Sequence, residues 1–232
     1  MTSNALELNQ LAADPIEEWR RMLRFSGLSD ADRSAMYLTV EVLLERGREM
    51  VVDTYDYLRS VPETAAILKW ETSVDQSHLE ERRRFFTVWL TRTLAVDTSE
   101  EFAAYLFRAG KLHAGQGPRQ IHTPSAFVTT SIGLVLANFA RYMAEAKIPG
   151  DVIAPAMSGW CKYLTVQLHQ MQYGYQIALE FADGYFPIQV SLYGRMRPIV
   201  GAPEITIQSR TGSNVADILR KFFNFRSIFL QY

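Results

Sequence analysis

The feature that most constrains the fold of this chain is a series of apolar residues at helical spacing in its third quarter. In two stretches, after Pro124 and after Pro149-Gly150, apolar side chains recur every three or four residues. Side chains at this spacing lie on one face of an α-helix. The series therefore predicts two long helices, over about residues 124–147 and 151–183.

The second of these helices is longer than a small domain needs, since about 30 residues at ~1.5 Å per residue span roughly 45 Å. We therefore expect the helices at about 124–147 and 151–183 to form a four-helix bundle between two copies of the chain, so that the protein is a homodimer. The alternative is a helical hairpin inside the core of a monomer.

Shorter helical patterns fill the chain before residue 124. Asp14-Pro15 predicts a helix start, because aspartate caps a helix and proline fits its first turn. Further helices are expected from Ser29 or Asp30 to Val61, over about 75–95, and from Ser99 to the glycines Gly115 and Gly117. The chain up to about residue 183 is therefore expected to be mainly α-helical.

Composition and charge exclude several classes of function. The 232 residues carry 24 Lys and Arg against 25 Asp and Glu, a formal charge of −1, which lacks the basic footprint of a general nucleic-acid-binding protein. The single cysteine, Cys161, excludes a disulfide framework or a cysteine-built metal site, and we expect it to be buried. No signal peptide, membrane span or catalytic constellation is visible, so we expect a cytoplasmic protein that is not an enzyme and has no membrane partner.

The pattern changes near residue 184. Apolar and polar residues alternate from Ile188, and again from Ile205 after a loop. Alternation is the period of a β-strand, and Ser213 or Asn214 can cap a helix after the second one. The tail is therefore expected to be a β-hairpin followed by a helix, which divides the chain into a domain of residues 1–184 and a segment of residues 185–232.

Residues 188–207 and 212–219 of this tail resemble the first half of a β-grasp sulfur carrier, of the kind found in the small subunit of molybdopterin synthase and in thiamin synthesis. The chain ends in Phe229-Leu-Gln-Tyr232 where such carriers have a diglycine, so the resemblance does not imply sulfur-carrier chemistry. A partial β-grasp leaves strand edges and phenylalanines such as Phe222 in need of cover. We expect it to pack on the helical domain, to bind a protein partner, or to be the remainder of a truncated fold.

His113 is the histidine whose surroundings favour a metal ligand. It follows a mostly apolar helical stretch and is part of Gly110-Lys-Leu-His-Ala-Gly-Gln-Gly117. A histidine at a helix end can bond a backbone carbonyl through one ring nitrogen and offer the other to a pocket, which suits an axial haem ligand. The alternative is a helix-terminal histidine that contacts only the last carbonyls.

Three motifs together resemble the sensor-globin and protoglobin superfamily over about residues 15–183. They are Tyr55 seven residues before Pro62, Trp89 on a later helix, and His113 four residues before Gly117 and 58 residues after Tyr55. The resemblance implies a mainly α, globin-like domain that holds haem b.

The resemblance also implies roles for four residues. His113 would be the proximal ligand of the iron, Tyr55 would hydrogen-bond oxygen on the distal side, and Phe86 and Trp89 would contact the cofactor. The implied function is to bind or sense a diatomic gas, with oxygen expected, and to signal to the tail or to a partner. The alternative within the superfamily is a haem-free globin-like interaction or scaffold module.

Two positions depart from the family pattern. Thr54 stands where an aromatic residue is common, and Arg82 falls near the place of an apolar distal residue. A charge facing haem is costly unless it meets a propionate or solvent, so Arg82 is expected to do one of these or to join a solvated face. Among the other histidines, His78 is an alternative sixth ligand, His122 is expected to cap a helix or touch a propionate, and His169 to lie in the core or at the dimer face.

Overall fold

The fold is known from a computed structural model that describes residues 14–182, 186–209, 215, 216, 218, 219 and 222. The structure divides into two compact units, residues 1–176 and 177–232. The domain boundary expected at residue 184 stays a prediction.

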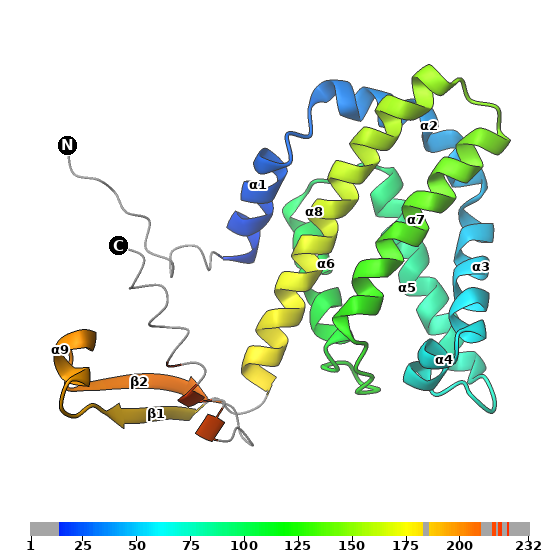
Figure 1. The fold of residues 1–232 in the computed structure, drawn as a ribbon. Coiled ribbons are helices and arrows are strands. Elements are labelled where there is room, and N and C mark those ends of the chain that lie inside the picture. The colour runs from blue at the N-terminus through cyan, green and yellow to red at the C-terminus, as the bar shows by residue number, and fades with distance from the viewer. Residues whose placement is uncertain (1–13, 183–185, 210–214, 217, 220–221, 223–232) are drawn as a thin grey trace, which may run out of the picture. The chain divides into compact units, whose positions relative to one another are not determined.

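Helices dominate the described residues of the first unit (Figure 1). They are α1 (Pro15–Phe25), α2 (Asp30–Glu45), α3 (Gly47–Ser60), α4 (Pro62–Leu68), α5 (Gln76–Leu94), α6 (Glu100–His113), α7 (Ser125–Glu145) and α8 (Gly150–Ala182). None of the helices in the described ranges is long and apolar enough to cross a membrane. The mainly α-helical fold expected from the sequence is confirmed.

The single helix expected up to Val61 is divided at Arg46 into α2 and α3, and the short α4 follows, which the sequence did not predict. The Arg46 guanidinium pairs with Glu145 at the end of α7, at 2.9 Å, and lies 4.4 Å from the centre of the Tyr142 ring. Arg46 also pairs with Glu49 of the next turn, at 2.6 Å. A local ion pair and contacts with a distant helix therefore both hold this residue, and the apolar periodicity around it did not predict the break.

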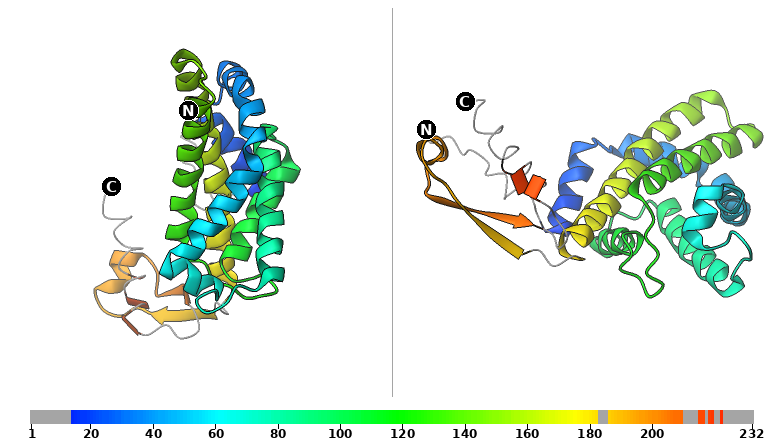
Figure 2. Two further views of the ribbon diagram at one scale, coloured as in Figure 1. Left: turned by 90° about the vertical axis from the view of Figure 1, so that its right-hand side faces the viewer. Right: turned by 60° about the horizontal axis from the view of Figure 1, so that its bottom comes forward.

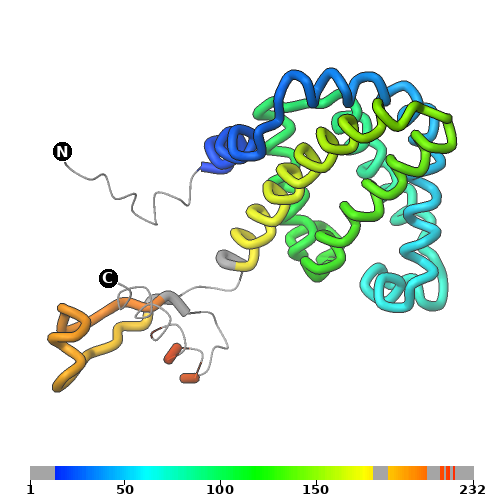
Figure 3. Tube along the Cα trace, turned by 45° about the horizontal axis from the view of Figure 1, so that its top comes forward, coloured from blue at the N-terminus to red at the C-terminus, as the bar shows by residue number. Residues whose placement is uncertain are grey.

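The two long helices predicted from the sequence are present and form a hairpin. α7 and α8 run side by side in the ribbon, in its turned views and in the tube (Figure 1, Figure 2, Figure 3). The buried rings of Phe139 and Trp160 meet edge to face at 5.2 Å, and Gln172 donates a hydrogen bond to the Thr129 hydroxyl at 3.0 Å. Cys161, expected to be buried, is exposed, because its neighbour Trp160 takes the core-facing position.

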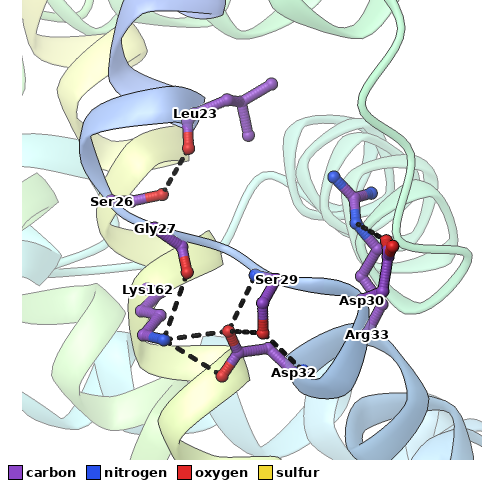
Figure 4. A network of polar contacts seen from close by, with 8 residues as sticks. All are labelled: Leu23, Ser26, Gly27, Ser29, Asp30, Asp32, Arg33 and Lys162. Atoms are coloured by element: carbon purple, nitrogen blue, oxygen red, sulfur yellow. Dashed lines mark hydrogen bonds and ion pairs between the residues drawn. The ribbon is translucent and has the colours of Figure 1, made fainter.

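The turn between α1 and α2 is tied to α8 by an ion pair (Figure 4). The Ser29 hydroxyl accepts from the Asp32 N–H, and the Asp32 carboxylate accepts from the Ser29 N–H at 2.8 Å, which together cap α2. Lys162 donates to the same carboxylate at 2.8 Å and to the Gly27 carbonyl at 3.3 Å. The hydrogen bond from Lys162, followed by that from Ser29, lowers the pKa of Asp32 to about 2. The pair therefore stays charged near neutral pH and fixes the start of α2 on α8.

Helices α6 and α8 cross in direct backbone contact at two glycines. A Cβ atom added to Gly110 would lie 1.9 Å from the Met171 carbonyl oxygen, and one added to Gly174 would lie 2.0 Å from the Phe107 carbonyl oxygen. Any side chain at either position would overlap the facing backbone. The crossing holds the last turn of α6, which carries His113, against α8.

The described part of the second unit contains the last residues of α8 and a two-stranded antiparallel sheet. β1 (Phe186–Ser191) pairs with β2 (Glu204–Ser209), and the short helix α9 (Met196–Val200) lies between them in the chain. Ile188 lies opposite Ile207 and Val190 opposite Ile205, so these side chains share one face. The predicted hairpin is confirmed. The helix expected after it lies largely outside the described residues, and the β-grasp resemblance stays a prediction.

Candidate functional site

An open cavity of about 710 Å³ is lined by residues of α3 to α8 and of the loop after α6. Its wall includes all four residues singled out from the sequence, Tyr55, Phe86, Trp89 and His113. Most of the remaining wall is apolar and includes Leu58, Phe127, Val128, Ile132, Val135 and Met171. Sites for drug-sized ligands and cofactors are typically ~300–1,000 Å³ and mostly apolar, so this cavity has the size and character of a cofactor site.

His113 is the last residue of α6, and one of its ring nitrogens is already engaged. Nδ1 lies 2.7 Å from the Ala109 carbonyl oxygen, one turn earlier, to which the N–H donates. This leaves Nε2 as the unprotonated nitrogen, and no described residue hydrogen-bonds it. Burial lowers the pKa of the imidazole, which favours the neutral ring. A neutral imidazole anchored through its other nitrogen is the form that binds a metal.

Tyr55 brings a hydrogen-bond donor from α3 into the same cavity. Its ring packs edge to face on Phe86 and Trp70, with ring centres 6.2 and 6.3 Å away, and its hydroxyl donates to the Arg82 carbonyl oxygen at 2.9 Å. Burial raises the pKa of the phenol, so Tyr55 keeps its proton. Thr54, where the family pattern favours an aromatic residue, also lines the cavity.

Phe86 and Trp89 form an aromatic wall on α5. Their rings stack with centres 5.2 Å apart. The buried indole N–H of Trp89 donates to the Gln167 side-chain oxygen at 2.8 Å, and the Thr93 hydroxyl donates to the same oxygen at 3.1 Å. Gln167 of α8 therefore fixes the orientation of this wall. The sequence analysis did not predict this role of Gln167, because the sequence does not show that a polar residue of α8 contacts Trp89 and Thr93 of α5.

Positive charge gathers around the cavity. Among its described lining residues, Arg82, Arg108, Lys111 and Arg119 are cationic and only Glu81 is acidic, and Glu81 is bonded to Arg119 at 3.0 Å. The whole chain has a formal charge of only −1, so this gathering is local. Cations around an apolar cavity favour a flat apolar ligand that carries anionic groups. In the sequence, the sign of this positive charge was the presence of Arg108 and Lys111, five and two residues before His113.

Arg82 lines the cavity and does not lie only on a solvated face. Its Nε donates to His78 Nε2 at 2.9 Å, and the His78 ring is buried with its centre 5.2 Å from that of Trp70. His78 is not among the residues that line the cavity, which gives its alternative role as a sixth ligand no support. Arg83 instead pairs with Glu80 at 3.1 Å, as expected of a solvated face.

The other two histidines make structural contacts. His122 pairs with the Tyr175 hydroxyl at 3.0 Å, and the cap position of α7 is taken by Pro124, so His122 does not cap that helix. His169 Nε2 lies 2.6 Å from a carboxylate oxygen of the buried Glu18. His169 therefore joins α8 to α1.

The described residues fit haem. The cavity offers an imidazole nitrogen free for the iron, an aromatic and aliphatic wall for the porphyrin, and cations for two propionates. Arg108 and Lys111, on the same helix as His113, are the residues we assign to those carboxylates. The fit rests on the donor set of the cavity and on the unpartnered Nε2 of His113.

Comparison with known proteins identifies the family and the fold. A family model described as Protoglobin matches residues 16–180. In structure the chain is similar to the globin domain of a globin-coupled sensor from Geobacter sulfurreducens, with 16% sequence identity, a TM-score of 0.55, and coverage of 68% of this chain and 97% of that one. The structural similarity confirms the globin-like fold expected from the sequence. No curated protein sequence matches. Since the family model spans more than half of the chain, the protein belongs to the protoglobin family.

Proposed function

We propose that the protein binds haem b and through it binds or senses a diatomic gas, with oxygen as the expected ligand, and that its role is binding and signalling, not catalysis. The observation that carries the proposal is that His113 and Tyr55 line the same, mostly apolar cavity. When bound, haem supplies an iron atom that can take a gas ligand. The chain itself would supply Nε2 of His113 as the ligand to that iron.

Tyr55 would stabilise a gas ligand that draws negative charge. Its single proton is donated to the Arg82 carbonyl here, and that carbonyl also belongs to α5, where the helix supplies its regular partner. The phenol can therefore turn to another acceptor and leave no backbone group without a hydrogen bond. Hydrogen bonds to charged acceptors contribute about 1.5–3 kcal/mol, more than those to a neutral carbonyl.

Haem addition to the purified protein tests the proposal. We expect a saturable Soret band, measured by absorbance during titration of the full chain. A protein that gives no Soret band would contradict the proposal and support the haem-free scaffold module.

The Tyr55→Phe variant tests the distal donor. We expect oxygen to dissociate about 10- to 100-fold faster, because one charge-assisted hydrogen bond is lost while the ring stays packed on Phe86 and Trp70. Stopped-flow measurement of oxygen release gives the rate. Carbon monoxide, a weaker acceptor, should dissociate at nearly the same rate from both proteins. An unchanged oxygen rate would remove Tyr55 from this role.

Signalling from the pocket would use contacts that lead from His113 to both long helices. The Thr123 N–H donates to the His113 carbonyl at 2.8 Å just before α7 begins, and Ala114 forms a β-bridge with His122. His122 in turn pairs with Tyr175 of α8. A shift of His113 would therefore reach the segment before α7, and Tyr175 on α8, through direct bonds. Its test is a measured difference between the haem-bound and gas-bound states in these two helices.

The surface of α7 and α8 supports the homodimer. Exposed positions on α7 include Ala126, Thr130, Gly133 and Ala137, and those on α8 include Ala154, Ser158, Cys161 and Thr165. Small uncharged side chains let helices of two copies approach closely. We expect light scattering to give a mass of about twice 26.5 kDa. Replacing Ala137 by Glu should shift the protein to the monomer, whereas Glu145→Gln at the end of the helix should not. A wild-type mass of one chain would exclude the bundle.

A further inference from the structure

Arg82 is the charged group in the cavity that the proposed function leaves without a role. Its Nε is held by His78, and its two terminal nitrogens form no hydrogen bond or ion pair with any described residue. A half-buried guanidinium normally binds a carboxylate or phosphate through these nitrogens. The described structure therefore provides a positive charge at the cavity wall and no anion to balance it.

The other cations of the lining differ from Arg82. Arg119 is engaged by Asp75 and Glu81 at 3.1 and 3.0 Å, and the Lys111 ammonium lies 5.0 Å from the centre of the Phe107 ring. Arg108 is exposed, as expected of a residue at the mouth of a cavity. Arg108 and Lys111 are the two cations assigned above to the carboxylates of haem. Arg82 is thus available for a different anion.

The backbone of Arg82 contacts the distal tyrosine, since its carbonyl oxygen accepts the Tyr55 hydroxyl. Burial is the main cause of the raised pKa of Tyr55, and the charge of Arg82 opposes it.

We propose that Arg82 and Tyr55 together make the distal side of the cavity a site for small inorganic anions, with Arg82 selecting charged over neutral ligands. The inference rests on the proposed function, because the iron held by His113 would bind the anion. A guanidinium and a phenol are both hydrogen-bond donors, and both residues line the cavity, from two different helices. Azide and fluoride represent this class of ligand.

Arg82→Gln tests the inference, with Arg84→Gln as the matched control. Arg84 lies on the same helix, is exposed and does not line the cavity. The probes are azide and fluoride, titrated into the ferric haem-loaded protein and followed by absorbance. We expect Arg82→Gln to raise the Kd for both anions about 10- to 100-fold, as for the loss of a charge-assisted hydrogen bond. Arg82→Lys, which keeps the charge without the planar fork, should give an intermediate value.

Carbon monoxide, a neutral ligand, shows whether Arg82→Gln loses only its preference for anions or weakens the binding of every ligand. The affinity of the ferrous protein for carbon monoxide should be nearly the same in wild type and Arg82→Gln. The C–O stretching frequency should rise in Arg82→Gln and not in Arg84→Gln, because a positive charge beside the ligand lowers it.

Three results would overturn the inference. They are an unchanged anion Kd in Arg82→Gln, an equal loss of anion and carbon monoxide affinity, and weaker haem retention with an unchanged anion Kd in the loaded fraction. The last would assign Arg82 to a haem propionate. Haem uptake by the wild type is measured before any anion is added. A wild type that takes up no haem would refute the proposed function and this inference together.

Discussion

Replacing His113 by alanine is expected to remove the protein's ligand to the haem iron. Nε2 of His113 is the unpartnered imidazole nitrogen of the cavity, and its ring is oriented by the bond from Nδ1 to the Ala109 carbonyl. Removing a residue that merely orients a metal ligand typically costs about 10- to 100-fold in affinity, so removing the ligand itself should cost more. Haem titration followed by absorbance measures the loss of affinity and the change in iron coordination.

His122→Ala is the matched control for this experiment. His122 lies nine residues further along, pairs with Tyr175 and does not line the cavity. Its variant should keep the wild-type coordination spectrum. Imidazole added to His113→Ala should restore that spectrum by filling the space that the side chain leaves. If His113→Ala has the wild-type spectrum without imidazole, the iron has a different ligand and the proximal assignment is wrong.

Replacing Gly110 by alanine is expected to destabilise the fold by about 2 kcal/mol. The added Cβ would lie 1.9 Å from the Met171 carbonyl oxygen, and a backbone atom cannot rotate away as a side chain can. Overpacking of this kind costs about 1–3 kcal/mol or more, against a gain of about 1 kcal/mol in helix propensity from glycine to alanine. Since about 1 kcal/mol shifts the Tm of a chain of this size by about 2–4 °C, thermal unfolding measures the loss.

Two further variants test whether the overlap at the crossing of α6 and α8 is what destabilises Gly110→Ala. Gly150→Ala, on α8 where no atom lies within 4 Å of the added Cβ, should change the Tm little. Gly110→Ala combined with Gly174→Ala should cost less than the sum of the two, because once the helices are forced apart the second overlap is already relieved. Equal Tm values for Gly110→Ala and Gly150→Ala would show that the helices separate at little cost.

The crossing of α6 and α8 also affects the position of His113 in the cavity. Gly110 precedes His113 by one turn of α6, so a helix pushed away from Met171 carries the imidazole with it. We therefore expect haem affinity to fall in Gly110→Ala even under conditions where the variant is folded.

Local signals in the sequence were enough for most of the helices. Asp14 caps α1 by accepting from the Ile16 N–H, and Ser99 caps α6 by accepting from the Phe102 N–H. Such caps act between residues two or three apart and are readable without a fold. The division at Arg46 was not predicted, because the apolar spacing continues through it and one of the two partners of Arg46, Glu145, is about a hundred residues away in the chain.

The sequence by itself determined the helical class, the hairpin of the tail, and the spacing of Tyr55 and His113, because these depend on periodicity, capping and the order of motifs. Only the tertiary structure decided that Tyr55 and His113 share a cavity and that Arg82 faces it without an anionic partner among the described residues. The physical reason is that a cavity and its charges are made by residues far apart in the chain. Which side chains meet there is fixed by helix crossings such as that at Gly110, and the period of a single helix does not contain them.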